Sequence, residues 1–184
     1  MFRTTARALV IAAAFGSVGS LAGCSTAPSS AQGKEHILED AEAALKQAKK
    51  SDETIAKLLS DAEGYAVFPT VGKGAIGVGG AYGKGVVYHR GSFVGYCDLS
   101  QASIGFQLGG QAYTEIIAFE TKDALQEFQN GDYSFNAQAT AVALKSGAGA
   151  NAKFKDGVAV FTMGEAGLMY EASIGGQRFS YLPK

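Results

Sequence analysis

Two different spacings of apolar residues divide the chain near residue 63. Between Lys34 and Ala62 the apolar positions recur at helical spacing, which predicts an amphipathic helix. Ser51 precedes two acidic residues, as an N-cap does, so we expect a second, shorter helix to begin there. The polar face lacks a basic character, so the helices are expected to pack on the domain rather than on a membrane surface. The apolar positions are Ile37, Leu38, Ala41, Ala44, Leu45 and Ala48, then Ile55, Leu58 and Leu59.

From Gly64 onward, apolar residues alternate with polar or small ones, which favours strands. The stretch KGAIGVGGAYGKGVV, residues 73–87, is glycine-rich. If it is extended, Ala81, Gly83 and Gly85 share one face, and Tyr82 shares the other with larger residues. Such a small face lets another backbone or a ligand approach closely. We interpret the glycines as a packing device for a bent sheet.

The second half of the chain continues the strand pattern around one helix. Thr121 is a suitable cap for the helix KDALQEFQ, and Asn130-Gly131 is a suitable end. Strand-like segments cover roughly residues 133–144, 152–163 and 167–182. The fold class predicted is α+β: a strongly bent, glycine-rich antiparallel sheet or barrel-like sandwich, with flanking N-terminal helices and one inserted helix.

The glycine-rich stretch also matches a nucleotide-binding pattern. Residues Gly72 to Gly77 satisfy G-x-G-x-x-G, which requires a helix directly after the glycines. Val78 and further glycines follow instead, and glycine is costly in a helix. A P-loop needs Ser or Thr after its lysine, and neither Lys73 nor Lys84 has one. We exclude a phosphate loop and expect no cofactor.

The first residues have the layout of an export signal. Arg3 and Arg7 precede an apolar run, residues 8–21, that is short for a membrane span. Leu21-Ala22-Gly23-Cys24 is similar to a bacterial lipobox, whose cysteine is acylated and becomes the new N-terminus. The alternative is an ordinary signal peptide that contains a cysteine. We expect Cys24 to carry lipid, palmitate included, as in a lipoprotein.

The expected organisation follows from this signal. Residues 1–23 form the signal peptide, residues 24–33 a lipidated flexible tether, and residues 34–184 the folded domain. Ser25, rather than an aspartate, follows the cysteine, which in lipoproteins of this kind favours the outer membrane. The expected location is the bacterial cell envelope, with the domain facing the periplasm.

Charge and chemistry-bearing residues narrow the function. The net charge of −1 over 184 residues argues against a nucleic-acid partner. Cys97 lies in the apolar segment SFVGYCDL, which predicts a buried thiol. His36 and His89 have no metal-ligand spacing around them. A catalytic triad would need His89, Asp98 and a serine to come together, but no G-x-S-x-G motif is present. We expect no enzyme, no catalytic residue and no metal ligand; an uncharacterised hydrolase is a weaker alternative.

Several segments together resemble the SYLF domain family. The resemblance covers about residues 34–184. It implies a compact, bent, β-rich domain with flanking helices. It also implies lipid binding, because eukaryotic SYLF proteins bind phosphoinositide membranes and bacterial ones are often envelope lipoproteins. The segments are Ala66-Val67-Phe68-Pro69, the lysine-glycine run through Gly85, Ile104-Gly105-Phe106-Gln107-Leu108-Gly109, Thr121-Lys122-Asp123-Ala124-Leu125 and, more weakly, residues 164–173.

Basic residues in the glycine-rich half are the candidate lipid contacts. The segment from Gly64 to Thr114 contains three basic residues, Lys73, Lys84 and Arg90, and one acidic residue. Glycines beside the lysines, such as Gly74, expose backbone N–H groups that bind anions. The other reading of the basic residues is as charges that keep strand edges soluble. The pair Lys153 and Lys155 is interpreted as a solvated face. The predicted function is a lipid-anchored protein that binds phospholipid, with anionic or phosphoinositide-like headgroups. The alternative is a non-enzymatic protein-interaction or structural envelope module.

Overall fold

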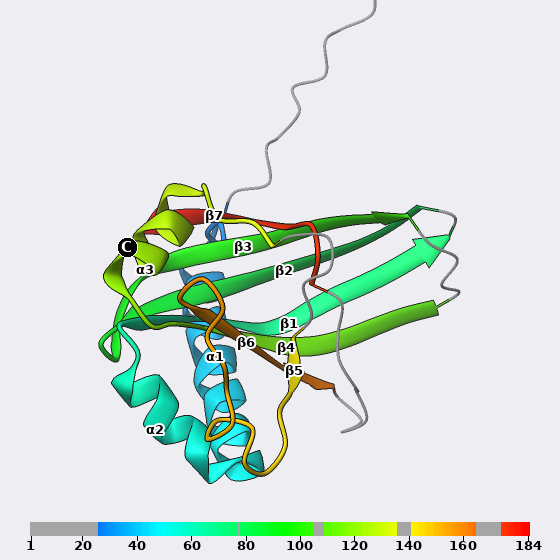
Figure 1. The fold of residues 1–184 in the computed structure, drawn as a ribbon. Coiled ribbons are helices and arrows are strands. Elements are labelled where there is room, and N and C mark those ends of the chain that lie inside the picture. The colour runs from blue at the N-terminus through cyan, green and yellow to red at the C-terminus, as the bar shows by residue number, and fades with distance from the viewer. Residues whose placement is uncertain (1–25, 77, 105–108, 136–140, 165–173) are drawn as a thin grey trace, which may run out of the picture.

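A computed structural model describes residues 26–184 except 77, 105–108, 136–140 and 165–173. Seven strands form one sheet in the order β5-β6-β4-β1-β2-β3-β7, and three helices pack against it (Figure 1). The helices are α1 (Ala31–Ser51), α2 (Glu53–Asp61) and α3 (Lys122–Asn130). The strands are β1 (Gly64–Ile76), β2 (Val78–His89), β3 (Ser92–Ile104), β4 (Gly109–Phe119), β5 (Val142–Ala143), β6 (Val158–Gly164) and β7 (Gln177–Pro183).

The predicted α+β class is confirmed, and the sheet is a single open one with β5 and β7 at its edges. All neighbouring strands are antiparallel except β5 and β6, which are parallel. The sheet is therefore mixed rather than purely antiparallel. The segment that matches the dinucleotide pattern runs through β1 into β2, so strand follows the glycines where a dinucleotide-binding loop would require a helix.

The N-terminal helices form where the apolar spacing predicts them, with two differences in their ends. α1 begins three residues earlier than expected, because the Ser30 side chain accepts a hydrogen bond from the Gly33 N–H and caps it. Ser51 is the last residue of α1, so its prediction as an N-cap is wrong. Asp52 caps α2 instead, because its carboxylate reaches the Thr54 N–H at 3.0 Å.

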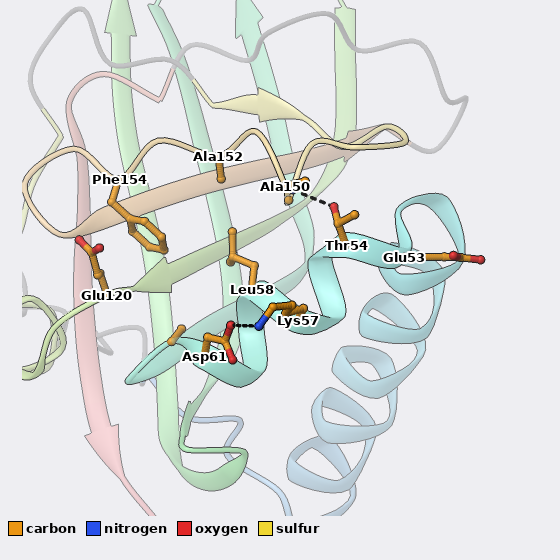
Figure 2. A pocket seen from close by; sticks show the side chains of 11 residues that line it. Glu53, Thr54, Lys57, Leu58, Asp61, Glu120, Ala150, Ala152 and Phe154 are labelled. Carbon is orange, nitrogen blue, oxygen red and sulfur yellow. Dashed lines mark hydrogen bonds and ion pairs between the residues drawn. The ribbon is translucent and has the colours of Figure 1, made fainter.

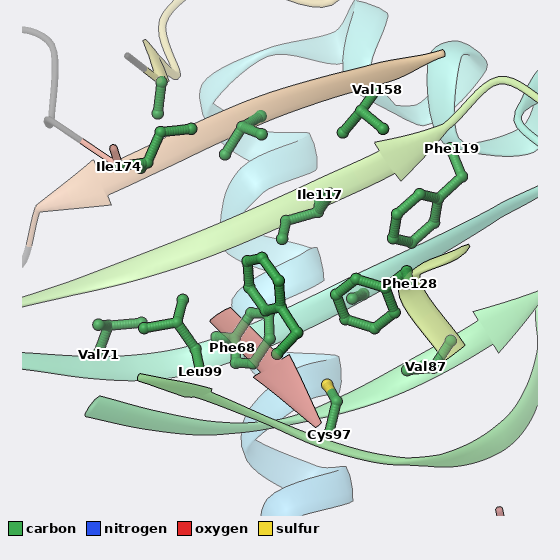
Figure 3. Close-up of a cluster of buried hydrophobic side chains, with 14 of the residues drawn as sticks. Phe68, Val71, Val87, Cys97, Leu99, Ile117, Phe119, Phe128, Val158 and Ile174 are labelled. Carbon is green, nitrogen blue, oxygen red and sulfur yellow. The ribbon is translucent and has the colours of Figure 1, made fainter. Parts of the chain in front are cut away.

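The apolar side chains divide into two cores, one on each face of the sheet. The helix-side core lies under α1 and α2, and the concave core lies on the opposite face with α3 (Figure 3). Main members of the helix-side core are Ala41, Leu45, Ala48, Ile55, Leu59, Val67, Val86, Tyr88, Tyr96, Ile116, Ala118 and Phe161. Main members of the concave core are Ala66, Phe68, Val71, Val87, Cys97, Leu99, Ile117, Phe119, Leu125, Phe128, Val158, Val160, Ile174 and Phe179.

Contacts between distant strands show that the sheet is strongly bent. In a flat sheet β4 and β7 would lie four strand intervals apart, about 19 Å. Yet the Gln177 side chain of β7 lies 3.0 Å from the Glu115 carboxylate of β4. Phe179 of β7 also lies with its ring centroid 6.0 Å from that of Phe68 in β1. The concave face therefore curls around its own side chains.

The small face of β2 makes this bend possible. A Cβ at Gly83 would lie 2.9 Å from Val71 Cγ2, and a Cβ at Gly85 would clash with the Val67 carbonyl oxygen and lie 2.8 Å from Phe68 Cδ1. These neighbours belong to β1, which carries an irregularity in register between Val67 and Thr70. At Gly83 and Gly85 the space is therefore filled by protein, as the packing interpretation predicts.

The inserted helix matches its prediction better than the late strands do. Thr121 caps α3, and Gly131 ends it with a left-handed φ of 76°. Strand structure within 133–144 is limited to β5, with residues 136–140 outside the described part. The segment 152–163 becomes strand only at Val158, because Asp156 and Gly157 form a tight turn with positive φ. The last segment becomes β7 from Gln177, with residues 165–173 outside the described part.

Candidate functional site

The predicted lipid-contact residues do not lie together. Lys73 follows Val71 on β1 at the same-face interval, which places it on the concave face. Lys84 precedes Val86 on β2 at the same interval, which places it on the helix side. The Lys84 ammonium donates to the Thr26 carbonyl at 3.1 Å. The two lysines therefore face opposite sides of the sheet.

Gly74 and Arg90 are equally separate. Gly74 is exposed, with no atom within 4 Å of where a Cβ would lie. Arg90 lies in the β2–β3 turn and donates to the Glu63 carboxylate from Nη2 at 2.9 Å and from Nε at 3.2 Å. Nine β1 residues, roughly 30 Å of strand, separate the Glu63 end of the sheet from Lys73. Cys24 lies outside the described residues.

The histidine and the buried cysteine have structural surroundings. His89 lies 2.9 Å from Glu63 Oε1, not beside Asp98, so the supposed triad has no His–Asp pair. His89 and Arg90 both hydrogen-bond Glu63 and hold the pKa of that carboxyl below its usual value. Cys97 is fully buried, as predicted, and burial raises the pKa of its thiol. Across the described residues, no group of three His, Cys or carboxylate side chains gathers as a metal site.

A hollow of about 380 Å³ lies along β6 and is called here the β6 hollow. Its rim carries Lys153 and Lys155 against one acid, Asp156. Its inner wall includes residues of the concave core, so the hollow combines an apolar interior with a net positive rim. The apolar lining is supplied by Tyr133, Phe135, Val142, Val158, Val160 and Ile174.

A larger groove of about 620 Å³ lies between α2 and the segment 149–154, and is called here the α2 groove. Figure 2 shows Leu58 rising from α2 toward Ala152 and Phe154 on the facing segment. Three carboxylates line this groove, from Glu53, Asp61 and Glu120, and its lysine, Lys57, pairs with Asp61 at 2.7 Å. The α2 groove is therefore apolar with a net negative rim, the opposite of the β6 hollow.

Polar side chains are buried where the concave face meets β7. We call Tyr113, Glu115, Thr162 and Gln177 the inner polar cluster; each is at most 1% exposed. Gln177 Nε2 donates to Glu115 Oε2 at 3.0 Å and lies 3.5 Å from the Tyr113 hydroxyl. Thr162 is the cross-strand partner of Glu115 in the β4–β6 pair, so both face the concave core.

The cluster is incompletely satisfied. Glu115 Oε1, Gln177 Oε1 and Thr162 Oγ1 have no hydrogen-bond partner among the described residues. Burial raises the pKa of Glu115 to about 7, although hydrogen bonds from Gln177 and Tyr113 act to lower it. Buried polar atoms without partners are rare and each calls for an explanation, such as a bound water or ligand.

Neither the β6 hollow nor the cluster emerges from the sequence interpretation. Lys153 and Lys155 are exposed, as their interpretation as a solvated face predicts, and the turn at Asp156 and Gly157 also brings them beside the apolar wall of the hollow. The burial of Glu115 could be predicted from the sequence, because it lies two residues from both Tyr113 and Ile117 and therefore shares their face of the strand. Its contact with β7 could not be predicted, since it depends on the bend of the whole sheet.

Comparisons with known proteins fit this architecture. Residues 100–181 match the family model described as Ysc84, Las17-binding protein actin regulator, which represents the SYLF domain. The chain is also 32% identical over 132 residues to Beta cell expansion factor A of Aeromonas veronii. The chain belongs to the SYLF family. In this SYLF chain the family match takes in β4, β6 and most of β7, which carry the inner polar cluster.

The relation to the relative is partial. The match covers 70% of this SYLF chain and 50% of the Aeromonas protein, so the chain spans about half the length of that relative. In the part of the chain that the structure describes, no helix has the length and apolar character needed to cross a membrane.

Proposed function

We propose that this SYLF domain binds anionic lipid at the β6 hollow, with an acyl chain on its apolar wall and the headgroup at Lys153 and Lys155. The proposal depends mainly on one observation, the combination of an apolar hollow of about 380 Å³ with a lysine-bearing rim. That volume lies within the range typical of small-ligand sites. At roughly 30 Å³ for a group the size of a water molecule, it holds on the order of a dozen methylene-sized groups, or one acyl chain.

The α2 groove is less suitable for the same ligand, although it is larger. Glu53, Asp61 and Glu120 on its rim would repel an anionic headgroup, and Lys57 is already paired with Asp61. Lysines near an anionic surface each contribute about 1 kcal/mol of attraction. Charge therefore favours the β6 hollow.

We also propose that acylated Cys24 holds the chain on the outer membrane, with the domain facing the periplasm. The support is the signal-like N-terminus that ends in Leu21-Ala22-Gly23-Cys24. Two or more acyl chains give durable anchoring, at about 0.8 kcal/mol per buried methylene. Mass spectrometry of the protein extracted from membranes tests this, since an unmodified Cys24 would contradict it.

Vesicle flotation tests lipid binding by the domain. The full chain with Cys24→Ser, which removes the acylation site, should bind phosphatidylglycerol-containing vesicles more than pure phosphatidylcholine vesicles, and less so at high salt. Lys153→Ala with Lys155→Ala should weaken this binding at least tenfold. Lys46→Ala with Lys49→Ala, both exposed on α1, is the matched control. Equal binding by the two double variants would contradict a site at the β6 hollow.

The same assay separates this site from the one predicted by sequence. If Lys73→Ala with Lys84→Ala removes binding and the Lys153 and Lys155 changes do not, the glycine-rich strands provide the lipid contact instead. The structure gives this outcome less support, because these two lysines face opposite sides of the sheet.

A protein-interaction module is the second candidate function, and the α2 groove favours it. An apolar groove with an acidic rim suits a basic, amphipathic segment of another protein. Crosslinking in cells should then capture a partner that Leu58→Asp loses, while lipid binding is unchanged.

A further inference from the structure

The starting observation is the set of buried oxygen atoms without partners in the inner polar cluster. Glu115 Oε1, Gln177 Oε1 and Thr162 Oγ1 all accept hydrogen bonds, and none has a partner among the described residues. Their side chains are essentially inaccessible to solvent. Leaving a buried acceptor unpaired destabilises the folded state, because the group has lost its hydrogen bonds to water. A guest that donates a hydrogen bond would remove part of this cost.

None of the four cluster residues lines the β6 hollow itself, but two residues that do line it lead toward the cluster. Val160 lines the hollow and precedes Thr162 on β6 at the same-face interval. Ile174 also lines the hollow, and its carbonyl accepts the backbone N–H of Gln177 at 3.2 Å. An acyl chain that follows the inner wall of the hollow past these two residues therefore approaches the unpaired oxygens.

The required donor is best supplied by a neutral hydroxyl. Burying an ammonium group would cost far more than burying a hydroxyl. A hydroxyl also both donates and accepts, so it can bond a carboxylate such as Glu115 and still accept from the Thr162 hydroxyl. This matches a cluster that contains both kinds of group.

The strand geometry gives the position of that hydroxyl along the chain. Lys155 pairs with Val158 across the turn, and Thr162 lies four residue steps, roughly 13 Å, after Val158 on β6. With C–C bonds of about 1.5 Å in a zigzag, this distance corresponds to roughly ten bonds. A carboxylate at the lysine rim would therefore place a mid-chain hydroxyl at the cluster.

We propose that the β6 hollow selects single-chain anionic amphiphiles that carry a mid-chain hydroxyl group, with Glu115, Thr162 and Gln177 as the residues that recognise the hydroxyl. This inference rests on the proposed lipid function, to which it adds the ligand class and three specificity residues. Lys153 and Lys155 hold the acid group, and the inner polar cluster discriminates between hydroxylated and plain chains.

A competition experiment tests the selectivity directly. The full chain with Cys24→Ser is mixed with equimolar stearate and 12-hydroxystearate, and native mass spectrometry measures the occupancy of each. We expect about tenfold more of the hydroxylated acid, as one added buried hydrogen bond would give. Equal occupancy by the two acids would overturn the inference, because the ligand hydroxyl would then bond the cluster no better than water does. The proposed lipid function would be unaffected. If neither acid binds, the proposed lipid site itself is overturned.

Variants assign the preference to the cluster. Thr162→Val keeps the side-chain shape and should reduce the preference for 12-hydroxystearate severalfold. Glu115→Leu should reduce the preference for the hydroxylated acid further. If Glu115→Leu fails to fold, Thr162→Val alone tests whether the cluster determines the preference. Thr70→Val, an exposed threonine of β1, is the matched control and should keep the full preference. A preference that survives Thr162→Val and Glu115→Leu would place the hydroxyl elsewhere and overturn the assignment.

Discussion

Asp52 and Glu115 are both buried carboxylates, but their surroundings differ. Asp52 accepts hydrogen bonds from the Thr54 N–H and hydroxyl and from the backbone N–H groups of Gly147 and Gly149, at 2.6 to 3.1 Å. Burial alone would raise its pKa, yet these bonds outweigh it and lower the pKa. Glu115 has Gln177 and Tyr113 as partners and keeps one unpaired oxygen among the described residues, and burial raises its pKa to about 7.

The difference separates the structural role of Asp52 from the binding role that we propose for Glu115. Asp52 caps α2 through its bonds with Thr54, and its bonds with Gly147 and Gly149 attach the 147–149 loop to that helix. Glu115 is held less completely than its burial requires, and this is the observation on which its proposed binding role rests. Four predictions test this comparison, beginning with the largest effect.

Removing the Asp52 carboxylate should destabilise the domain most. Asp52→Ala loses the α2 cap and leaves the buried N–H of Gly149 without its acceptor, so we expect the free energy of unfolding to fall by about 3–4 kcal/mol. Urea denaturation measures this. Asp61→Ala, an exposed acid on the same helix, should change it by less than about 1 kcal/mol. If Asp52→Ala lowers the free energy of unfolding as little as Asp61→Ala does, the Asp52 carboxylate does not hold α2 and the 147–149 loop together.

The two carboxylates should give stability opposite dependences on pH. The folded state holds the Glu115 proton up to about pH 7, whereas the usual pKa is 4.5. The free energy of unfolding should therefore fall as pH rises from 4.5 through 7, by up to about 3 kcal/mol. Glu115→Gln should remove this slope. The Asp52 contribution is instead lost below its usual pKa of 3.8, as pH falls through its lowered value. If the unfolding free energies of the wild type and Glu115→Gln depend on pH in the same way, Glu115 is not the source of this pH dependence.

The bend of the sheet should control the environment of Glu115. Gly85→Ala places a Cβ against the Val67 carbonyl and the Phe68 ring, so we expect a loss of about 2 kcal/mol from overpacking. If the strands separate, the Glu115 pKa should move toward 4.5, which NMR titration can measure. Gly74→Ala is the control, since its Cβ meets no atom within 4 Å. If Gly85→Ala destabilises the domain but leaves the Glu115 pKa unchanged, the bend of the sheet does not control the environment of Glu115.

The smallest expected effect compares a bonded threonine with an unbonded one. The Thr54 hydroxyl donates to Asp52 at 2.7 Å and accepts from the Ala150 N–H at 2.8 Å, so Thr54→Val should cost about 1–2 kcal/mol. The Thr162 hydroxyl has no partner among the described residues, so Thr162→Val should change stability by less than about 0.5 kcal/mol, or increase it. Thermal unfolding of both variants is the measurement. Equal costs would show that Thr162 is bonded after all.

Local patterns predicted the elements that local forces determine. The Thr121 cap and the Gly131 end of α3 follow from side-chain capping and left-handed backbone, both of which are properties of a few adjacent residues. The Asp52 cap was missed in favour of Ser51, because half of its bonds come from Gly147 and Gly149, far along the chain. The start of β6 was predicted too early for a different, local reason, because the adjacent residues Asp156 and Gly157 form a turn within the apolar alternation.

The candidate site was less predictable than the fold. The basic residues of the glycine-rich stretch are close in sequence, but strand alternation places Lys73 and Lys84 on opposite faces. The β6 hollow and the inner polar cluster combine residues from β4, β6 and β7 with the segments before them. Such a site depends on sheet order and curvature, which no short window of sequence contains.

The position of β7 has a consequence for the order of folding. The strands β1, β2 and β3 pair in the order in which they follow along the chain. β4 then pairs with β1 on its other side. β7 instead joins β3 through pairs such as Gln101 with Gln177, after nearly the whole domain has been synthesised. Long-range pairing of this kind is slow. We therefore expect a newly made chain to expose its concave face until β7 pairs with β3, which makes the closing of that face one of the last steps of folding.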